Sequence, residues 1–192
     1  MVTLEAGEAG GEAGGGGAGG GVLAEDDYRV RQLVYTYAIA VDAQRWDLFD
    51  ELFTDSVVAD YTTKRWTSLA AWKADFSVFH AQFSGTQHCI GGVSWHVADG
   101  FISAFSYGVA RLVSRGAPGG DYAEAGAWYD DRIVRTGQGL RIASRVCRMM
   151  WAGGNTSLLS GGRADTEWYS VSAAGRGGGV THLQTRPGSG WR

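Results

Sequence analysis

The chain has 192 residues, of which 31 are glycine, and ten of these fall within the first 21 positions. Without that segment about 170 residues remain, which suit one domain with a hydrophobic core rather than two. The net charge of −3 comes without blocks of like charge and argues against a nucleic-acid partner. No apolar run approaches the roughly 18 residues that cross a bilayer, so no membrane partner is expected. The two cysteines, Cys89 and Cys147, lack the spacing of a metal site and favour a reduced, cytoplasmic protein.

Composition divides the chain into segments. Residues 1–23 are rich in Gly and offer almost nothing to bury, so they predict a disordered tail. Residues 24–155 predict a single α+β domain. Residues 156–192 are rich in Gly, Ser and Arg and predict a second tail, with one short strand at 167–171.

The first half of the domain predicts helices. From Ala24, apolar residues recur at helical spacing up to Val41. The acidic residues Glu25, Asp26 and Asp27 stand where acids complement a helix N-terminus. A short helix is expected at 46–53 and a short strand at 57–61. Ser68 is expected to cap a third helix that runs to about residue 83.

After Gly85 the chain becomes rich in β-branched and aromatic residues, interrupted by Gly. Strands are predicted near residues 86–97, 101–114, 121–136 and 139–152. Helices followed by antiparallel strands indicate an α+β fold in which the helices pack on one face of a curved sheet. Such a cone-shaped barrel is expected to leave a pocket at its mouth.

Asp42 interrupts an apolar helical row. It lies one i+4 step beyond Val34 and Ala38, so its carboxylate is expected to face inward. Near a helix C-terminus a carboxylate is repelled by the helix dipole and penalised by burial, and it therefore needs a cationic or hydrogen-bonding partner. The alternative is that Asp42 only caps the turn before Arg45.

His88 opens the first long strand, just before the pair Gly91–Gly92, which predicts a β-bulge. A lone strand histidine is more often structural, but an Asp that accepts its Nδ1 hydrogen would leave Nε2 as a general base near neutral pH. Tyr61 ends the short strand at 57–61. Its hydroxyl either polarises a carbonyl oxygen or belongs to a core residue whose hydroxyl is satisfied by a neighbour.

Metal and cofactor sites find no support in the sequence. His80, His88 and His96 are evenly spaced, but eight residues of strand span roughly 26 Å, too far for one shared ion. The N-terminal Gly run is neither preceded by a strand nor followed by Lys-Ser or Lys-Thr, so it does not predict a phosphate-binding loop. Neither a metal nor another cofactor is therefore expected.

Several segments in fixed order carry a resemblance to a known family. They are residues 37–47 (YAIAVDAQRWD), 52–55 (LFTD), 59–61 (ADY), 86–92 (TQHCIGG) and 151–155 (WAGGN). Together they resemble the SnoaL-like branch of the nuclear-transport-factor-2-like superfamily, and most closely scytalone dehydratase and its bacterial relatives. The resemblance covers about residues 25–155.

The resemblance implies the same α+β cone and a buried Asp–His dyad that abstracts a proton from carbon without a cofactor. Matched position by position, the dyad falls on Asp42 and His88, and a Tyr that holds a carbonyl or leaving oxygen falls on Tyr61. The implied activity is β-elimination or isomerisation. His88 would take the α-proton, Asp42 would stabilise the imidazolium and Tyr61 would stabilise the enolate.

This chain differs from scytalone dehydratase at several positions of the pocket. Scytalone dehydratase has a Tyr immediately before its Asp, where this chain has Val41. The second pocket His of scytalone dehydratase falls near residues 110–111 of this chain, and its pocket Asn falls near Tyr129. These changes alter the water-holding half of that site. A pocket lined by Trp66, Val109 and Tyr129 is expected to bind a flat, hydrophobic, oxygenated ring such as a polyketide or a steroid.

Two alternatives to the lyase or isomerase remain open. One is a polyketide cyclase that uses the same dyad to form a carbon–carbon bond. The other is a non-catalytic module for ligand binding or assembly, in which Asp42 and His88 form a structural hydrogen bond. The Trp and Tyr expected at alternating strand positions predict a homo-oligomer, a dimer or a trimer.

Overall fold

The computed structural model describes residues 17–160, with side chains from residue 24 to residue 159. Its elements, in chain order, are α1 (Gly17–Asp42), α2 (Phe49–Leu52), β1 (Phe53–Tyr61), β2 (Arg65–Trp66), α3 (Leu69–His80), β3 (Gly85–Ala98), β4 (Phe101–Val113), β5 (Tyr122–Thr136), β6 (Gly139–Gly154) and α4 (Ser157–Ser160). Most of the two predicted tails, including the strand expected at 167–171, lies outside the described residues.

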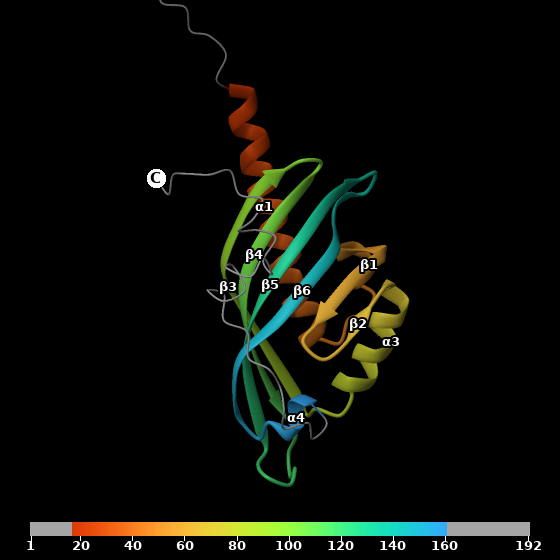
Figure 1. The fold of residues 1–192 in the computed structure, drawn as a ribbon, viewed down its shortest axis with the longest axis vertical. Helices are drawn as coiled ribbons and strands as arrows, with labels where there is room; N and C mark the ends of the chain where they lie inside the picture. Colours follow the sequence, from red (N-terminus) through yellow and green to blue (C-terminus); the bar gives the residue numbers. More distant parts are fainter. Residues whose placement is uncertain (1–16, 161–192) are drawn as a thin grey trace, which may run out of the picture.

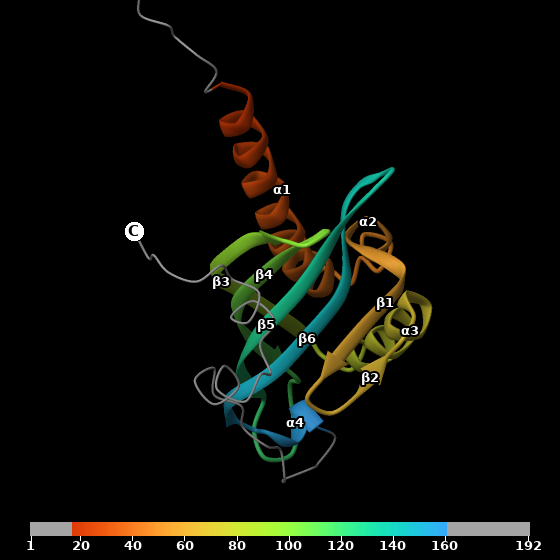
Figure 2. The same ribbon diagram turned by 45° about the horizontal axis from the view of Figure 1, so that its top comes forward.

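The strands form one curved sheet in the order β2-β1-β6-β5-β4-β3. All neighbours are antiparallel except β1 and β6, which run parallel. Figure 1 shows the long strands β3 to β6 bending together, with α1 crossing one face of the sheet and α3 lying beside β1 and β2. The view in Figure 2 shows α2 and α3 together at the β1 side of the same face. The predicted α+β cone is confirmed.

The core lies between the helices and the concave face of the sheet. The apolar row of α1 is buried there, as its helical spacing predicts. It packs against a group of large rings from α2, β1 and α3, whose members are Phe49, Phe53 and Trp72. Burial of each such side chain stabilises the fold by about 1.5–3 kcal/mol. The C-terminal half of α1 is thereby fixed against the sheet.

Helix α1 begins at Gly17 rather than at Ala24, so the end of the predicted disordered tail is helical. The physical reason is cooperativity: once the packed part of a helix exists, each further residue adds a hydrogen bond without a new nucleation cost. The acidic residues consequently lie inside the helix and not in its first turn. Glu25 and Asp27 form i,i+4 ion pairs with arginines of α1, while Asp26 pairs with Arg135 of β5.

Other boundaries differ from the predictions by a few residues. The second helix is limited to Phe49–Leu52, since Phe53 already belongs to β1. Helix α3 is capped by Ser68, which accepts a hydrogen bond from the backbone of Ala71, and it ends at His80. The four long strands lie within two residues of their predicted ends.

Bulges decide which side chains of the sheet face the core. On β3 the register shifts between Gly91 and Ser94, where Gly92 has a φ of 59°, so the predicted bulge is confirmed. On β6, Ile142 and Ser144 pair with two consecutive residues of β5, so one residue of β6 between them is extra. As a result Ile142 faces the core before this bulge and Arg145 faces it afterwards.

Candidate active site

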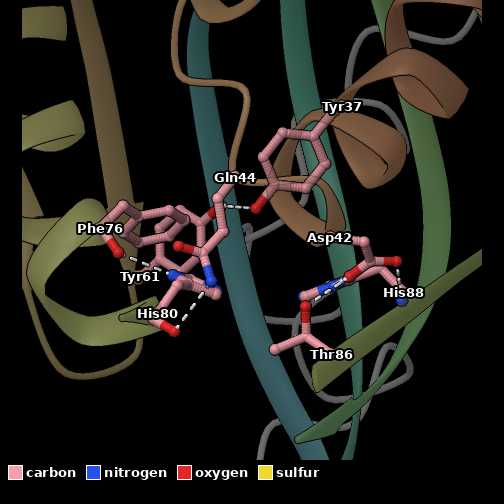
Figure 3. Close-up of polar contacts among 8 residues, drawn as sticks. All are labelled: Tyr37, Asp42, Gln44, Tyr61, Phe76, His80, Thr86 and His88. Atoms are coloured by element: carbon pink, nitrogen blue, oxygen red, sulfur yellow. Dashed lines mark hydrogen bonds and ion pairs between the residues drawn. The ribbon is translucent and has the colours of Figure 1, made fainter. Parts of the chain in front are cut away.

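The end of α1 places the carboxylate of Asp42 over the start of β3. The helix stops because Gln44 adopts a φ of 51°, and the amide of Arg45 then donates to the carbonyl of Ala40 at 2.8 Å. The carboxylate accepts three hydrogen bonds from β3. These come from the backbone N–H of His88 (2.7 Å), the hydroxyl of Thr86 (2.8 Å) and Nδ1 of His88 (2.7 Å). Figure 3 shows both residues of β3 turned toward Asp42.

This arrangement assigns the tautomer of His88. A carboxylate is an acceptor only, so Nδ1 must carry the hydrogen that is shared with Asp42. In the neutral form of the ring the lone pair is then on Nε2, and within the described part of the chain no hydrogen bond is made to that atom. The His88 side chain is 9 % exposed and that of Asp42 is 25 % exposed, so solvent reaches the pair mainly on the Asp42 side.

The pKa of Asp42 follows from two opposed causes. Burial raises the pKa of this carboxyl, whereas the side-chain and backbone hydrogen bonds from His88 and the hydrogen bond from Thr86 lower it. The hydrogen bonds outweigh burial, and the pKa lies below its usual value. Asp42 thus keeps its negative charge beside His88 at neutral pH.

Two tyrosine hydroxyls form the other polar group of the site. Tyr37 of α1 lies five residues before Asp42, and its hydroxyl is 2.9 Å from that of Tyr61 at the end of β1. The Tyr37 ring meets the His88 ring edge-on at 6.5 Å between centroids, so Tyr37 lies between Tyr61 and the dyad. Burial raises the pKa of Tyr37 to about 12 and holds that of Tyr61 well above its ordinary value. Both hydroxyls are hydrogen-bond donors at neutral pH.

The residues predicted to line a pocket have different locations. Tyr129 is buried on the concave face, with its ring 5.9 Å from that of Tyr37. Trp66 packs edge-on against Tyr61 at 5.7 Å, and its indole N–H donates to Asp75. Val109 was expected beside them but lies on the opposite face of the sheet. The reason is strand alternation: Ala110 pairs with His88, so the adjacent Val109 points away and is 37 % exposed.

Small residues lie next to His88 across the sheet. Its direct partner on β4 is Ala110, whose own partner on β5 is Ala125. One step along the strands, Gly108 faces the core under the ring of Tyr129: a Cβ there would lie 2.5 Å from Cε2 of that ring. The concave surface beside the dyad is therefore built from side chains that occupy little volume.

His80 is a second imidazole in this region. It is 3 % exposed at the end of α3, with its ring 6.2 Å from that of His88. Its Nδ1 donates to the carbonyl of Phe76 at 2.8 Å, and its own carbonyl accepts from Gln44 at 3.2 Å (Figure 3). Burial lowers the pKa of His80 to about 4, so this ring is neutral at neutral pH.

Two cavities of about 480 and 460 Å³ lie apart from the dyad. The first is a groove over α2 and α3 that contains the Lys73–Asp50 ion pair, and the second lies between α1 and the turn that joins β5 to β6. Neither is lined by Asp42, His88 or Tyr61, so the predicted pocket at the mouth of the cone is not one of them. Among the described residues, no helix is long and apolar enough to cross a membrane.

Comparison with known proteins identifies the family of the chain. The model of the SnoaL-like domain matches residues 23–146, which include Asp42, Tyr61 and His88. The chain belongs to the SnoaL-like family. A relative from Mycobacterium tuberculosis, the uncharacterized protein Rv2910c, is 30 % identical over 129 residues, which make up 63 % of this chain and 83 % of the relative.

Several solved structures have the same fold. Kfla4162 from Kribbella flavida superposes with a TM-score of 0.66 at 22 % identity, covering 71 % of this chain and 97 % of that one. A proposed scytalone dehydratase from Novosphingobium aromaticivorans gives 0.66 at 13 % identity, covering 78 % and 95 %. ActVI-ORFA from Streptomyces coelicolor gives 0.54 at 20 % identity, covering 67 % and 97 %.

Four residues of the site were not singled out by the sequence. Thr86 could have been found, because it lies two residues before His88 and alternation places both on one face. Tyr37 is the one hydroxyl in an otherwise aliphatic helical row, and a buried hydroxyl needs a partner. His80 was considered only as a metal ligand. No sequence pattern predicts that Arg145 faces the core, because its inward position depends on the bulge in β6.

Proposed function

We propose that this protein is a cofactor-independent lyase or isomerase that removes a proton from the carbon next to a ring ketone. The observation that carries the proposal is the 2.7 Å contact between Nδ1 of His88 and Asp42. It leaves Nε2 as the base and provides a carboxylate to stabilise the imidazolium that forms. Resemblance to scytalone dehydratase supports the same assignment.

The steps follow from the positions of the groups. Nε2 of His88 takes the α-proton, the C–H bond breaks, and the electron pair moves to the carbonyl oxygen to give an enolate. The paired hydroxyls of Tyr37 and Tyr61 contain two O–H groups, and only one of them is used within the pair. The other is free to donate to the enolate oxygen. The enolate then expels a β-substituent, or is protonated by His88 at another carbon.

Hydrogen exchange tests this step without knowledge of the natural substrate. 1-Tetralone, a flat ring ketone, would be incubated with the protein in D₂O, and loss of its α-proton signals would be followed by NMR. We expect His88→Ala and Asp42→Asn to slow exchange by about 10²-fold or more. Asp47→Asn is the matched control, because Asp47 is a carboxylate paired with Arg45 at 2.6 Å on the surface.

Exchange that stays within about threefold of wild type in both dyad variants would contradict the proposal. It would favour the second candidate, ligand binding without turnover. One observation supports that candidate: the two described cavities are not lined by the dyad. A polyketide cyclase would pass the exchange test as well, and would be recognised by a product with a new carbon–carbon bond.

A further inference from the structure

A buried ion pair lies beneath the tyrosine hydroxyls and takes no part in the step just described. Arg145 of β6 is 0 % exposed and binds Asp131 of β5 through two parallel hydrogen bonds, Nε to Oδ1 at 2.8 Å and Nη2 to Oδ2 at 2.7 Å. The neighbouring strands contribute Ala104 and Ala59 at the same level. These small side chains leave room for a guanidinium inside the sheet's concave face.

Aromatic rings enclose this guanidinium. Its central carbon lies 4.2 Å from the ring centre of Tyr37, 4.7 Å from that of Tyr129 and 5.4 Å from that of Phe53. Nη1 of Arg145 is buried and has no hydrogen-bond partner, whereas Nε and Nη2 both donate to Asp131. A buried donor without an acceptor is costly, and the position of this one beside the rings of Tyr37 and Tyr129 points to a role on their side.

The two charges of the Arg145–Asp131 pair affect the neighbouring tyrosine hydroxyls to different extents. Burial raises the pKa of Tyr37, Tyr61 and Tyr129, and in each case the cation of Arg145 opposes this rise. The carboxylate of Asp131 is among the main influences only for Tyr129. The hydroxyl pair of Tyr37 and Tyr61 therefore experiences chiefly the positive end of the ion pair.

We propose that Arg145 is a positioning residue that strengthens the hydrogen bond donated by the Tyr37–Tyr61 hydroxyl pair to an oxyanion, and that the site therefore prefers phenolate or enolate ligands over their neutral analogues. This rests on the proposed function only in placing the ligand oxygen at the hydroxyl pair. Asp131 holds the guanidinium in place, and the ring of Tyr37 transmits its effect. The cation cannot itself touch the ligand, since the rings cover it.

The test compares an anionic probe with a neutral one of similar shape. 4-Nitrophenolate and 4-nitroanisole would be bound to wild type and to the double variant Arg145→Met, Asp131→Leu, which removes both charges together. We expect the double variant to lose about tenfold or more in affinity for 4-nitrophenolate and to keep its affinity for 4-nitroanisole.

Arg145→Lys, with Asp131 kept, provides the rescue. It retains the positive charge without the planar contact, and we expect a phenolate affinity between those of wild type and the double variant. Equal phenolate affinity in wild type and the double variant, or no preference for 4-nitrophenolate over 4-nitroanisole in wild type, would overturn the proposal. Native near-ultraviolet circular dichroism checks that each variant folds.

This result is separable from the proposed function. If 1-tetralone exchange is independent of His88 but phenolate affinity follows Arg145, the proton-transfer step is wrong and the role of Arg145 stands. If exchange depends on His88 while phenolate affinity ignores Arg145, only the role of Arg145 is wrong.

Discussion

Two polar pairs of the concave face are built in opposite ways. Asp42 and His88 lie at the edge of the core, and every polar contact of the carboxylate comes from one strand, β3. Asp131 and Arg145 lie at its centre, fully buried, with one guanidinium nitrogen unpaired. The peripheral pair is partly open to solvent and leaves Nε2 of His88 without a hydrogen bond, whereas the central pair is closed to solvent and leaves Nη1 of Arg145 without one. The first suits proton transfer, and the second suits a fixed charge.

The largest expected effect breaks the central pair. Arg145→Met alone leaves the carboxylate of Asp131 buried without a partner, and we expect a loss of about 3–5 kcal/mol in the free energy of unfolding. The double variant with Asp131→Leu should recover most of this loss, because both charges are then gone. Urea denaturation measures both. Equal stability of the single and double variants would show that the two charges do not depend on one another.

Acid should destabilise the protein through His80, whose ring lies next to that of His88. Because burial lowers the pKa of this imidazole to about 4 from an ordinary 6.5, the unfolded chain binds more protons than the folded one between these values. Stability is therefore full above pH 6.5 and falls by up to about 3 kcal/mol as the pH drops to about 4. In His80→Gln, urea denaturation across this range should show a shallower pH dependence. An unchanged slope would assign the loss to other groups.

Gly108→Ala tests whether the ring of Tyr129, which lies between Gly108 and Arg145, is fixed in its position. Tyr129 contacts Arg145 on one side and covers Gly108 on the other, and a Cβ at Gly108 would lie 2.5 Å from its ring. We expect a loss of about 1–3 kcal/mol in thermal unfolding, because the ring must shift. Gly137→Ala is the matched control, since nothing lies within 4 Å of a Cβ there. Similar losses in both variants would mean that the ring is not constrained.

The smallest expected effect concerns the peripheral pair. Thr86→Val removes one of the three hydrogen bonds to Asp42 and should cost about 1 kcal/mol in stability. The His88 tautomer should persist, because its own contact to Asp42 is unaffected; ¹⁵N shifts of the imidazole would report Nδ1–H in this variant as in wild type. In Asp42→Asn the same measurement should show a changed tautomer balance. A changed balance in Thr86→Val would make the hydroxyl, and not the carboxylate, the group that orients His88.

The fold was largely predictable because its signals are local. Glycine-rich turns and runs of β-branched residues placed the strands, and Ser68 marked the start of α3. Asp42 was found by the i+4 rule, since a carboxylate in an apolar row needs a partner. Which strand residues face the core depends on the register between strands, and the sequence of one strand does not determine that register. Val109 was placed on the wrong face for this reason, and Arg145 faces inward only because β6 carries an extra residue.

The parallel pairing of β1 with β6 has a consequence for folding during synthesis. Ala59 lies beside Arg145, so the sheet is complete only after nearly the whole domain has left the ribosome. Asp42 and His88 are synthesised long before that point, and helix α1 and strand β3 can meet while β1 still has an unpaired edge. The concave face can close around Arg145 only once β6 has been synthesised, whereas both segments that carry Asp42 and His88 are present earlier.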